Sequence, residues 1–388
     1  MEARDLGLER LNLTDNPFLK VGIPRGFVEW GDRKEVKEQL ESHAIAVASS
    51  GRARNLIVRG GYGSGKTHCL RYLNWFVNTK LAAEMKEKPP LSIYVKNPGE
   101  SFADLFRATL AGISFDELRR SAIRLCSTLV YELFKKSREA SQIEKDQLFL
   151  TLVSSLQEET LARSILTRFG GLSQEFSRFI AALALGRDDD VAERWLAGEK
   201  ISSADLKRLG VSAPILTDDQ SVETLDSTLR LVTVGGGMRT FIICLDEFED
   251  IAELTRKESL SYLRHLRRFL DAHTTDFSAV VAVDTDVLER IRKTYAPIGS
   301  RLRQAEKIDL SYLTRDQIQR FIEDICEPYK TRKNSALPFQ KSAYDVVSDI
   351  TRGVARDVVK LVHDSIELAA KEGVDSIDAK LMRRAARP

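Results

Sequence analysis

The chain has 388 residues, of which 43% are hydrophobic and 30% charged, a composition typical of a helix-rich globular protein with room for two or three domains. Its 59 basic and 57 acidic side chains leave a net charge of only +2. The overall charge therefore does not indicate nucleic-acid binding, and any such binding must come from a local patch of basic residues. The four cysteines form no CxxC pair, no apolar run is long enough to span a membrane, and the first residues lack a signal peptide's apolar core. We therefore expect a cytoplasmic protein with buried thiols and no membrane contact.

The first half of the chain is predicted to contain a helix, two strands joined through a second helix, and a long helical segment, in that order. Turn signals dominate residues 1–30, and the next segment predicts a helix over about 33–49. An apolar strand at 55–58 is followed by a glycine-rich loop and a helix-like segment at 69–76, and the β-branched run at 91–95 predicts the next strand. Helical periodicity then continues from about 99 to 230, which is too long for a strand connection and indicates an inserted helical subdomain.

Two further apolar runs, at 240–245 and 278–283, predict strands on either side of a basic amphipathic helix at about 256–271. Near-continuous apolar strands are typical of a parallel sheet covered on both faces. After residue 310 the pattern is helical to the end, which indicates a small separate bundle. The sequence therefore predicts an α/β fold, with a parallel five-stranded sheet between helices, a large helical insert and a C-terminal helical domain.

The glycine-rich loop has the pattern GxxxxGK[ST] between a strand and a helix, which is the context of a phosphate-binding loop. Its glycines let backbone N–H groups turn onto phosphates, and the helix start adds its positive dipole end. We expect Lys66 to reach the β- and γ-phosphates and Thr67 to ligate Mg²⁺. The sequence thus predicts a site for ATP and Mg²⁺. For Tyr62, the alternative interpretation is an exposed aromatic side chain in the loop that does not contact the nucleotide. The nucleotide-contacting residues are predicted to be Gly60, Gly61, Tyr62, Gly63, Ser64, Gly65, Lys66, Thr67 and His68.

A second chemical signal is the acid pair Asp246–Glu247, which ends the apolar strand at 240–245. The carboxyl ends of parallel strands line the crevice where ligands bind in open α/β folds. Asp246 is expected to hold Mg²⁺ opposite Thr67, and Glu247 to orient and deprotonate an attacking water.

From about residue 25 to the C-terminus, apart from the insert, these motifs resemble the AAA+ ATPases. The resemblance implies a γ-phosphate-sensing residue, sensor 1, at the end of the strand at 278–283; the usual Asn is absent, and Thr285 is the candidate with Asp284 as the alternative. It also implies an oligomer, a ring or a filament. The predicted domains are 1–98, with the phosphate loop; 99–235, the insert; 236–310, with the acid pair and sensor 1; and 311–388, the lid.

Two arginines match further AAA+ motifs. Ser-Arg-Leu at 300–302 resembles the arginine-finger segment, so Arg301, or failing it Arg303, is expected to reach the γ-phosphate held by a neighbouring subunit. Gly-Val-Ala-Arg at 353–356 resembles sensor 2, so Arg356 is expected to let the lid grip the nucleotide. Residues 28–33 lie where such proteins pass beneath the adenine.

The insert carries a narrower resemblance. Arg-Trp-Leu-Ala-Gly-Glu at 194–199 and Asp-Leu-Lys-Arg-Leu-Gly-Val at 205–211, followed by Leu-Asp-Glu-Phe-Glu at 245–249, are similar to the ATP-binding proteins of BREX-type phage-defence loci, the BrxC/BrxD-like group. That resemblance implies ATP binding and a role in defence against foreign DNA, with a helicase or another defence-system protein as partner.

A cationic strip could supply DNA contacts. Arg264, Arg267 and Arg268 fall at i, i+3 and i+4 and share one helix face; the alternative is an ordinary solvated face. We therefore expect Mg²⁺-dependent ATP binding and hydrolysis by an oligomer that acts on double-stranded DNA, in defence. The alternatives are a regulator or loader in transposition or DNA replication, and a nucleotide-gated scaffold that does not hydrolyse ATP.

Overall fold

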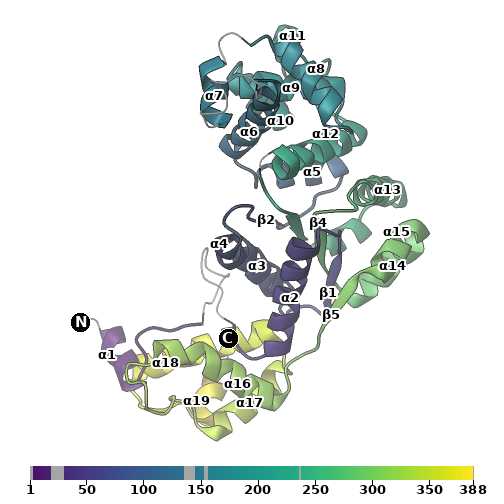
Figure 1. Cartoon of the computed structure of the whole chain (residues 1–388). Helices are drawn as coiled ribbons and strands as arrows, with labels where there is room; N and C mark the ends of the chain where they lie inside the picture. Colours follow the sequence, from purple (N-terminus) through teal and green to yellow (C-terminus); the bar gives the residue numbers. More distant parts are fainter. Residues whose placement is uncertain (1–2, 19–29, 135–144, 153–155, 236, 388) are drawn as a thin grey trace.

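A computed structural model describes residues 3–18, 30–134, 145–152, 156–235 and 237–387. Figure 1 shows an elongated molecule, with a central sheet, a helical body at one end and a second helical body, which contains both the first and the last described helices, at the other. None of the helices in the described ranges is long and apolar enough to cross a membrane.

The central sheet has five parallel strands in the order β2-β3-β4-β1-β5, which confirms the predicted fold. Residues on β3 and β4 are buried along the whole strand, because helices cover both faces. In the edge strand β5 only Ile308 and Leu310 are buried, and no apolar run in the sequence predicts this strand. The strands are β1 Leu56–Gly60, β2 Leu91–Val95, β3 Phe241–Leu245, β4 Phe277–Val283 and β5 Glu306–Leu310.

Alternate strand residues face opposite helical layers. Leu56, Val58 and Ile242 share a core with α2 (Lys34–Ser50) and α3 (Lys66–Phe76). The neighbouring positions, including Ile57 and Ile243, pack on the other face. That face is covered by α13 (Arg256–Ala272), α14 (Thr285–Thr294) and α15 (Ala296–Gln304), while η1 (Val77–Leu81) and α4 (Ala82–Glu84) extend α3.

The segment between β2 and β3 forms the helical body at the top of Figure 1. Its apolar residues belong to the same cluster as one face of the sheet, so a continuous core joins the insert to the sheet. The helices are α5 Phe102–Leu110, α6 Phe115–Phe134, α7 Lys145–Leu152, α8 Glu158–Arg168, α9 Gln174–Ala184, α10 Asp189–Leu196, α11 Ser203–Leu209 and α12 Asp218–Arg230, followed by η4 Leu231–Gly235.

The C-terminal bundle has a separate core, and the N-terminus belongs to it. The first helix, α1 (Ala3–Arg10), packs on α18 (Ala355–Glu372), and Leu8, Leu11, Leu13 and Phe18 are buried in this core. The sequence predicted residues 1–30 as irregular, so this packing is new. The other elements are α16 Arg315–Cys326, η6 Glu327–Tyr329, α17 Lys341–Thr351, α18 Ala355–Glu372 and α19 Ala379–Ala385.

Candidate nucleotide-binding site

The glycine-rich loop leaves β1 at Gly60 and enters α3 at Lys66. Gly63 and Gly65 have φ of 72° and 107°, in the left-handed region where glycine is favoured. At Gly60, an added Cβ would lie 2.5 Å from the carbonyl oxygen of Leu310 on the neighbouring strand β5. The glycines therefore permit both the path of the loop and its close contact with the sheet.

Lys66, the first residue of α3, faces acidic side chains. Only 8% of the residue is exposed, and its ammonium donates to the carbonyl oxygen of Gly60 at 3.0 Å and to a carboxylate oxygen of Asp284. A carboxylate oxygen of Glu249 lies 4.0 Å from the same ammonium. The carboxylates of Asp284 and Glu249 thus both lie close to the Lys66 ammonium.

Asp246 follows β3 directly and is only 3% exposed. Its Oδ2 accepts a hydrogen bond from the Tyr94 hydroxyl at 2.7 Å, and its backbone N–H donates to the carbonyl of Val95 at 2.9 Å. Burial and the contact with Asp246 raise the pKa of Tyr94, so the phenol stays a donor. Both β2 contacts hold the carboxylate at the carboxyl edge of the sheet.

Glu247 and Thr67 lie close to this edge. Glu247 takes a left-handed conformation, with φ of 50°, and caps the 3₁₀ helix η5 (Phe248–Ala252). Thr67, in the first turn of α3, is partly buried. Oxygen ligands suit Mg²⁺, which usually takes one or two protein ligands and completes its shell with phosphate oxygens and water. No group of three or more potential metal ligands occurs among the described residues, and a magnesium ion held by Asp246 and Thr67 needs none.

At the end of β4, the structure brings Asp284, the alternative sensor 1 candidate, to Lys66. Thr285, the first choice from the sequence, is exposed at the start of α14. Asp284 is the N-cap residue between β4 and α14, and Thr285 is the first residue of that helix.

The C-terminal bundle touches the glycine-rich loop. The Arg356 guanidinium lies 4.5 Å from the centre of the Tyr62 ring and donates to its hydroxyl, while the Arg356 backbone N–H donates to the Gly63 carbonyl at 3.2 Å. Tyr62 is 69% exposed, so this stack lies at the surface. The loop that binds phosphate and the helix that carries Arg356 are therefore in direct contact.

Arg33 is a further residue at the loop, and sequence reasoning gave it no such role. Its guanidinium donates to the carbonyl of Ser64 at 2.7 Å and to the carbonyl of Ser311 in the connection to the bundle. Burial lowers the pKa of Arg33. A surface arginine and one that holds a loop look alike in a single sequence, so no signal could have identified it.

Trp30 belongs to the segment predicted to lie near the adenine; Val28 and Glu29 of that segment fall outside the described residues. The Trp30 ring centre is 5.2 Å from the imidazole of His68 and 4.8 Å from the ring of Tyr72. The rings of Trp30 and Tyr72 line a cavity of about 420 Å³ beside α3. Its lining includes Trp30, Tyr72, Trp75, Phe76, Asp324 and Pro328.

Arg301 lies on α15 and pairs with Asp271 of α13, with 2.6 Å between Nη2 and Oδ1. Its side chain is 45% exposed. A role at a neighbouring subunit's nucleotide would require this arginine to exchange Asp271 for phosphate.

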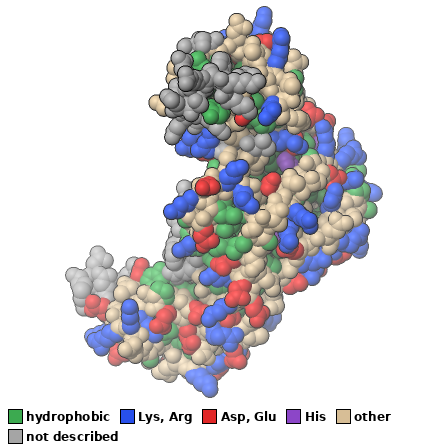
Figure 2. All heavy atoms as spheres, in the orientation of Figure 1, with side chains coloured by type: hydrophobic (Ala, Val, Ile, Leu, Met, Phe, Trp, Pro, Cys, Tyr) green, Lys and Arg blue, Asp and Glu red, His purple; other side chains and the backbone are tan. Residues whose placement is uncertain are grey.

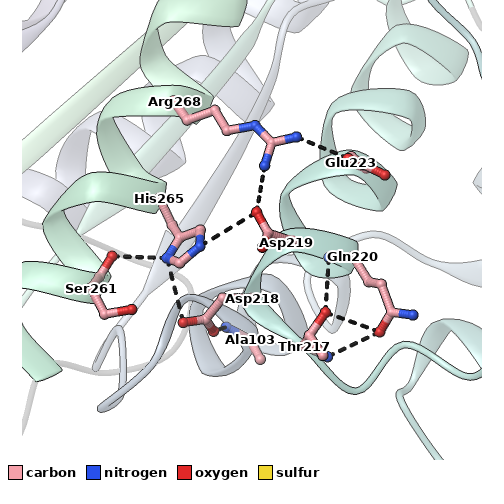
Figure 3. A network of polar contacts seen from close by, with 9 residues as sticks. All are labelled: Ala103, Thr217, Asp218, Asp219, Gln220, Glu223, Ser261, His265 and Arg268. Carbon is pink, nitrogen blue, oxygen red and sulfur yellow. Dashed lines mark hydrogen bonds and ion pairs between the residues drawn. The ribbon is translucent and has the colours of Figure 1, made fainter.

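Two of the three arginines in the predicted DNA-binding strip have acidic partners within the chain. Arg268 pairs with Asp219 and Glu223 of α12 at 2.5 and 2.8 Å (Figure 3). Arg267 pairs with Asp271 at 3.2 Å and donates to the Tyr295 hydroxyl at 3.3 Å, while Arg264 is exposed. Arg267 and Arg268 therefore help to hold α13 against neighbouring helices.

The contact between α12 and α13 joins the insert to the segment that follows the acid pair. Figure 3 shows His265 between the Ser261 carbonyl, 2.8 Å away, and the carboxylates of Asp218 and Asp219. Further along the same helices, His273 lies 3.2 Å from Asp226. Because α13 follows Glu247 and η5 in the chain, the insert is attached close to the candidate site.

Comparison with known proteins identifies the family. The BREX system ATP-binding protein BrxC/D family matches residues 27–358. The chain belongs to this family. No curated protein matches it.

Solved structures similar to this BrxC/D-family chain have the AAA+ fold. The Aeropyrum pernix ORC2 protein in its ADPNP-ADP complexes is 14% identical, with 93% of this chain and 70% of that chain covered and a TM-score of 0.51. The ADP form of the same protein is 12% identical, with the same coverage and a TM-score of 0.50. At these identities the likeness shows the fold alone, and the predicted AAA+ fold is confirmed.

Proposed function

We propose that this BrxC/D-family chain hydrolyses the ATP that its family binds, in a Mg²⁺-dependent reaction. The observation that carries the proposal is the contact between Lys66 and Asp284 at the carboxyl edge of the sheet, where Asp246 directly follows β3, the strand between β2 and β4. The ORC2 structure with ADPNP and ADP gives an example of nucleotide in a related fold.

In this proposal, the residues of the loop from Gly60 to His68 bind the triphosphate, and Lys66 leaves Asp284 for the β- and γ-phosphates. Thr67 and Asp246 hold Mg²⁺, which supplies positive charge against the charge that develops on the phosphates. Glu247 orients the attacking water, and Asp284 or Thr285 senses the γ-phosphate.

Two arginines complete the proposed site. Arg356 exchanges its stack on Tyr62 for the nucleotide, since a guanidinium binds phosphate oxygens through two N–H groups. Arg301 of a neighbouring subunit offsets charge in the transition state, so hydrolysis requires a homo-oligomer, a ring or a filament.

The proposed partner is double-stranded DNA, in defence against foreign DNA together with a helicase or another defence-system protein. The support is membership of the BREX family and a basic surface on α14, α15 and β5. Figure 2 shows Lys and Arg side chains gathered along the edge of the molecule where Figure 1 places α13 to α15. The exposed bases there are Arg290, Lys293, Arg303 and Lys307. We expect the protein to act in the cytoplasm.

Substitution of the phosphate-loop lysine tests the nucleotide site. Lys66→Ala should abolish binding of a fluorescent ATP analogue, because it removes the ammonium expected at the phosphates. Lys207→Ala, in α11 of the insert and exposed, is the matched control and should bind as the wild type does. Wild-type affinity in Lys66→Ala would contradict the proposal.

A further inference from the structure

Glu249 lies in the candidate site, although the phosphate-loop and acid-pair motifs do not include it. After β3 the left-handed Glu247 turns the chain into η5, and Phe248 and Ile251, at 1% and 0% exposure, anchor that short helix in the core. Glu249, between these anchors, points its Oε1 to within 4.0 Å of the Lys66 ammonium. The backbone after β3 therefore delivers a third acidic side chain to the site.

The other oxygen of this carboxylate has no protein partner. Glu249 Oε2 is buried and accepts no hydrogen bond from any described residue. An unsatisfied buried acceptor is costly, and such an atom in a native site indicates a missing ligand or water. The side chain as a whole is 29% exposed, which leaves a path for water to reach it.

Burial favours proton uptake by Glu249. Burial is the largest effect and raises its pKa, while a hydrogen bond from its own backbone N–H and the charge of Lys66 lower it, and the charges of Asp284 and Asp246 raise it. Asp284 already contacts the Lys66 ammonium directly. A role as the counter-ion of Lys66 would duplicate that contact and would leave the buried Oε2 unexplained.

We propose that Glu249 is a second catalytic carboxylate, which accepts the proton of the attacking water while Glu247 orients that water. The inference rests on the proposed ATP hydrolysis. The water oxygen forms a bond to the γ-phosphorus, the bond from that phosphorus to the β–γ bridging oxygen breaks, and ADP leaves with its electron pair. The water proton moves to the Glu249 carboxylate and later returns to solvent.

The test compares Glu249→Gln, Glu249→Asp, Glu247→Gln and a matched control, Glu253→Gln, whose side chain at the end of the same turn is 77% exposed. Three quantities are measured: affinity for a fluorescent ATP analogue with Mg²⁺, the single-turnover hydrolysis rate, and the Tm. Glu249→Gln should bind within about threefold of the wild type and keep its Tm, while its hydrolysis rate falls about 100-fold or more. Glu249→Asp should recover part of the rate, and Glu253→Gln should match the wild type.

The outcomes separate this inference from the function it rests on. If Glu249→Gln hydrolyses at the wild-type rate and Glu247→Gln does not, Glu247 suffices and the inference is overturned, while ATP hydrolysis stands. If Glu249→Gln loses affinity and Tm together, its role is structural and the inference is also overturned. If the wild type shows no turnover, the inference and the proposed hydrolysis fall together.

Discussion

Replacing Tyr94 with phenylalanine should weaken the Mg²⁺-dependent part of nucleotide binding. The Tyr94 hydroxyl donates to Asp246 at 2.7 Å, and Asp246 is 3% exposed, so water has little access to replace the lost donor. A metal-binding carboxylate depends on such a partner for its orientation.

The size of the effect follows from the type of bond. A hydrogen bond to a charged group contributes about 1.5–3 kcal/mol, and about 1.4 kcal/mol corresponds to a factor of ten. The Mg²⁺ concentration for half-maximal binding of an ATP analogue should therefore rise about 10- to 100-fold in Tyr94→Phe. Without Mg²⁺ and nucleotide, the variant should also lose about 1–3 kcal/mol of stability, because a buried acceptor is left unpaired.

The assay is a Mg²⁺ titration at a fixed concentration of a fluorescent ATP analogue. Tyr344→Phe is the matched control, because its hydroxyl also donates to a carboxylate, that of Glu323 at 3.4 Å, but inside the C-terminal bundle. The control should titrate as the wild type does. A midpoint for Tyr94→Phe within twofold of the wild type would refute the role given to Asp246.

Three further substitutions test other parts of the account. Gly353→Ala should lower the Tm in calorimetry, because φ at this position is 77° and an added Cβ would lie 2.1 Å from the Leu313 carbonyl oxygen. Gly170→Ala is the control and should keep the wild-type Tm, because a Cβ there meets nothing within 4 Å. Burial lowers the pKa of His273 from 6.5 to about 4. Between these two pH values the unfolded chain binds a proton at this imidazole and the folded chain does not. The free energy of unfolding should therefore fall by about 3 kcal/mol as the pH falls from 6.5 to about 4. His273→Asn should flatten this pH dependence in urea unfolding, and an unchanged slope would contradict the assignment. Arg301→Ala should lower hydrolysis about 1,000-fold, and mixing it with Glu247→Gln subunits should restore part of the rate; no recovery would contradict action between subunits.

The parts of the fold and site that the sequence predicted are those with local causes. The glycine-rich loop is recognisable because each position in eight consecutive residues has a fixed task, and β3 and β4 because strands buried on both faces must be apolar throughout. The edge strand β5 was not located, because only Ile308 and Leu310 of its five residues are buried and the others are charged. Its burial depends on the neighbouring strand and leaves little trace in its own sequence.

The contacts in the site that escaped prediction depend on distant partners. Tyr94 acquires its role from Asp246, 152 positions away, and Asp284 from Lys66, 218 positions away. The spacing of Arg267 and Arg268 indicated a cationic face, but the acids that neutralise Arg268 lie 45 and 49 residues earlier, on α12. Helical periodicity shows which side chains share a face and cannot show what that face contacts.

Steady-state ATP hydrolysis, measured against protein concentration with and without double-stranded DNA, tests the central claim most directly. The wild type should show turnover that rises with protein concentration and with DNA, and Glu247→Gln should show none. Tight ATP binding without turnover under any of these conditions would contradict the account, and the protein would then be a nucleotide-gated scaffold.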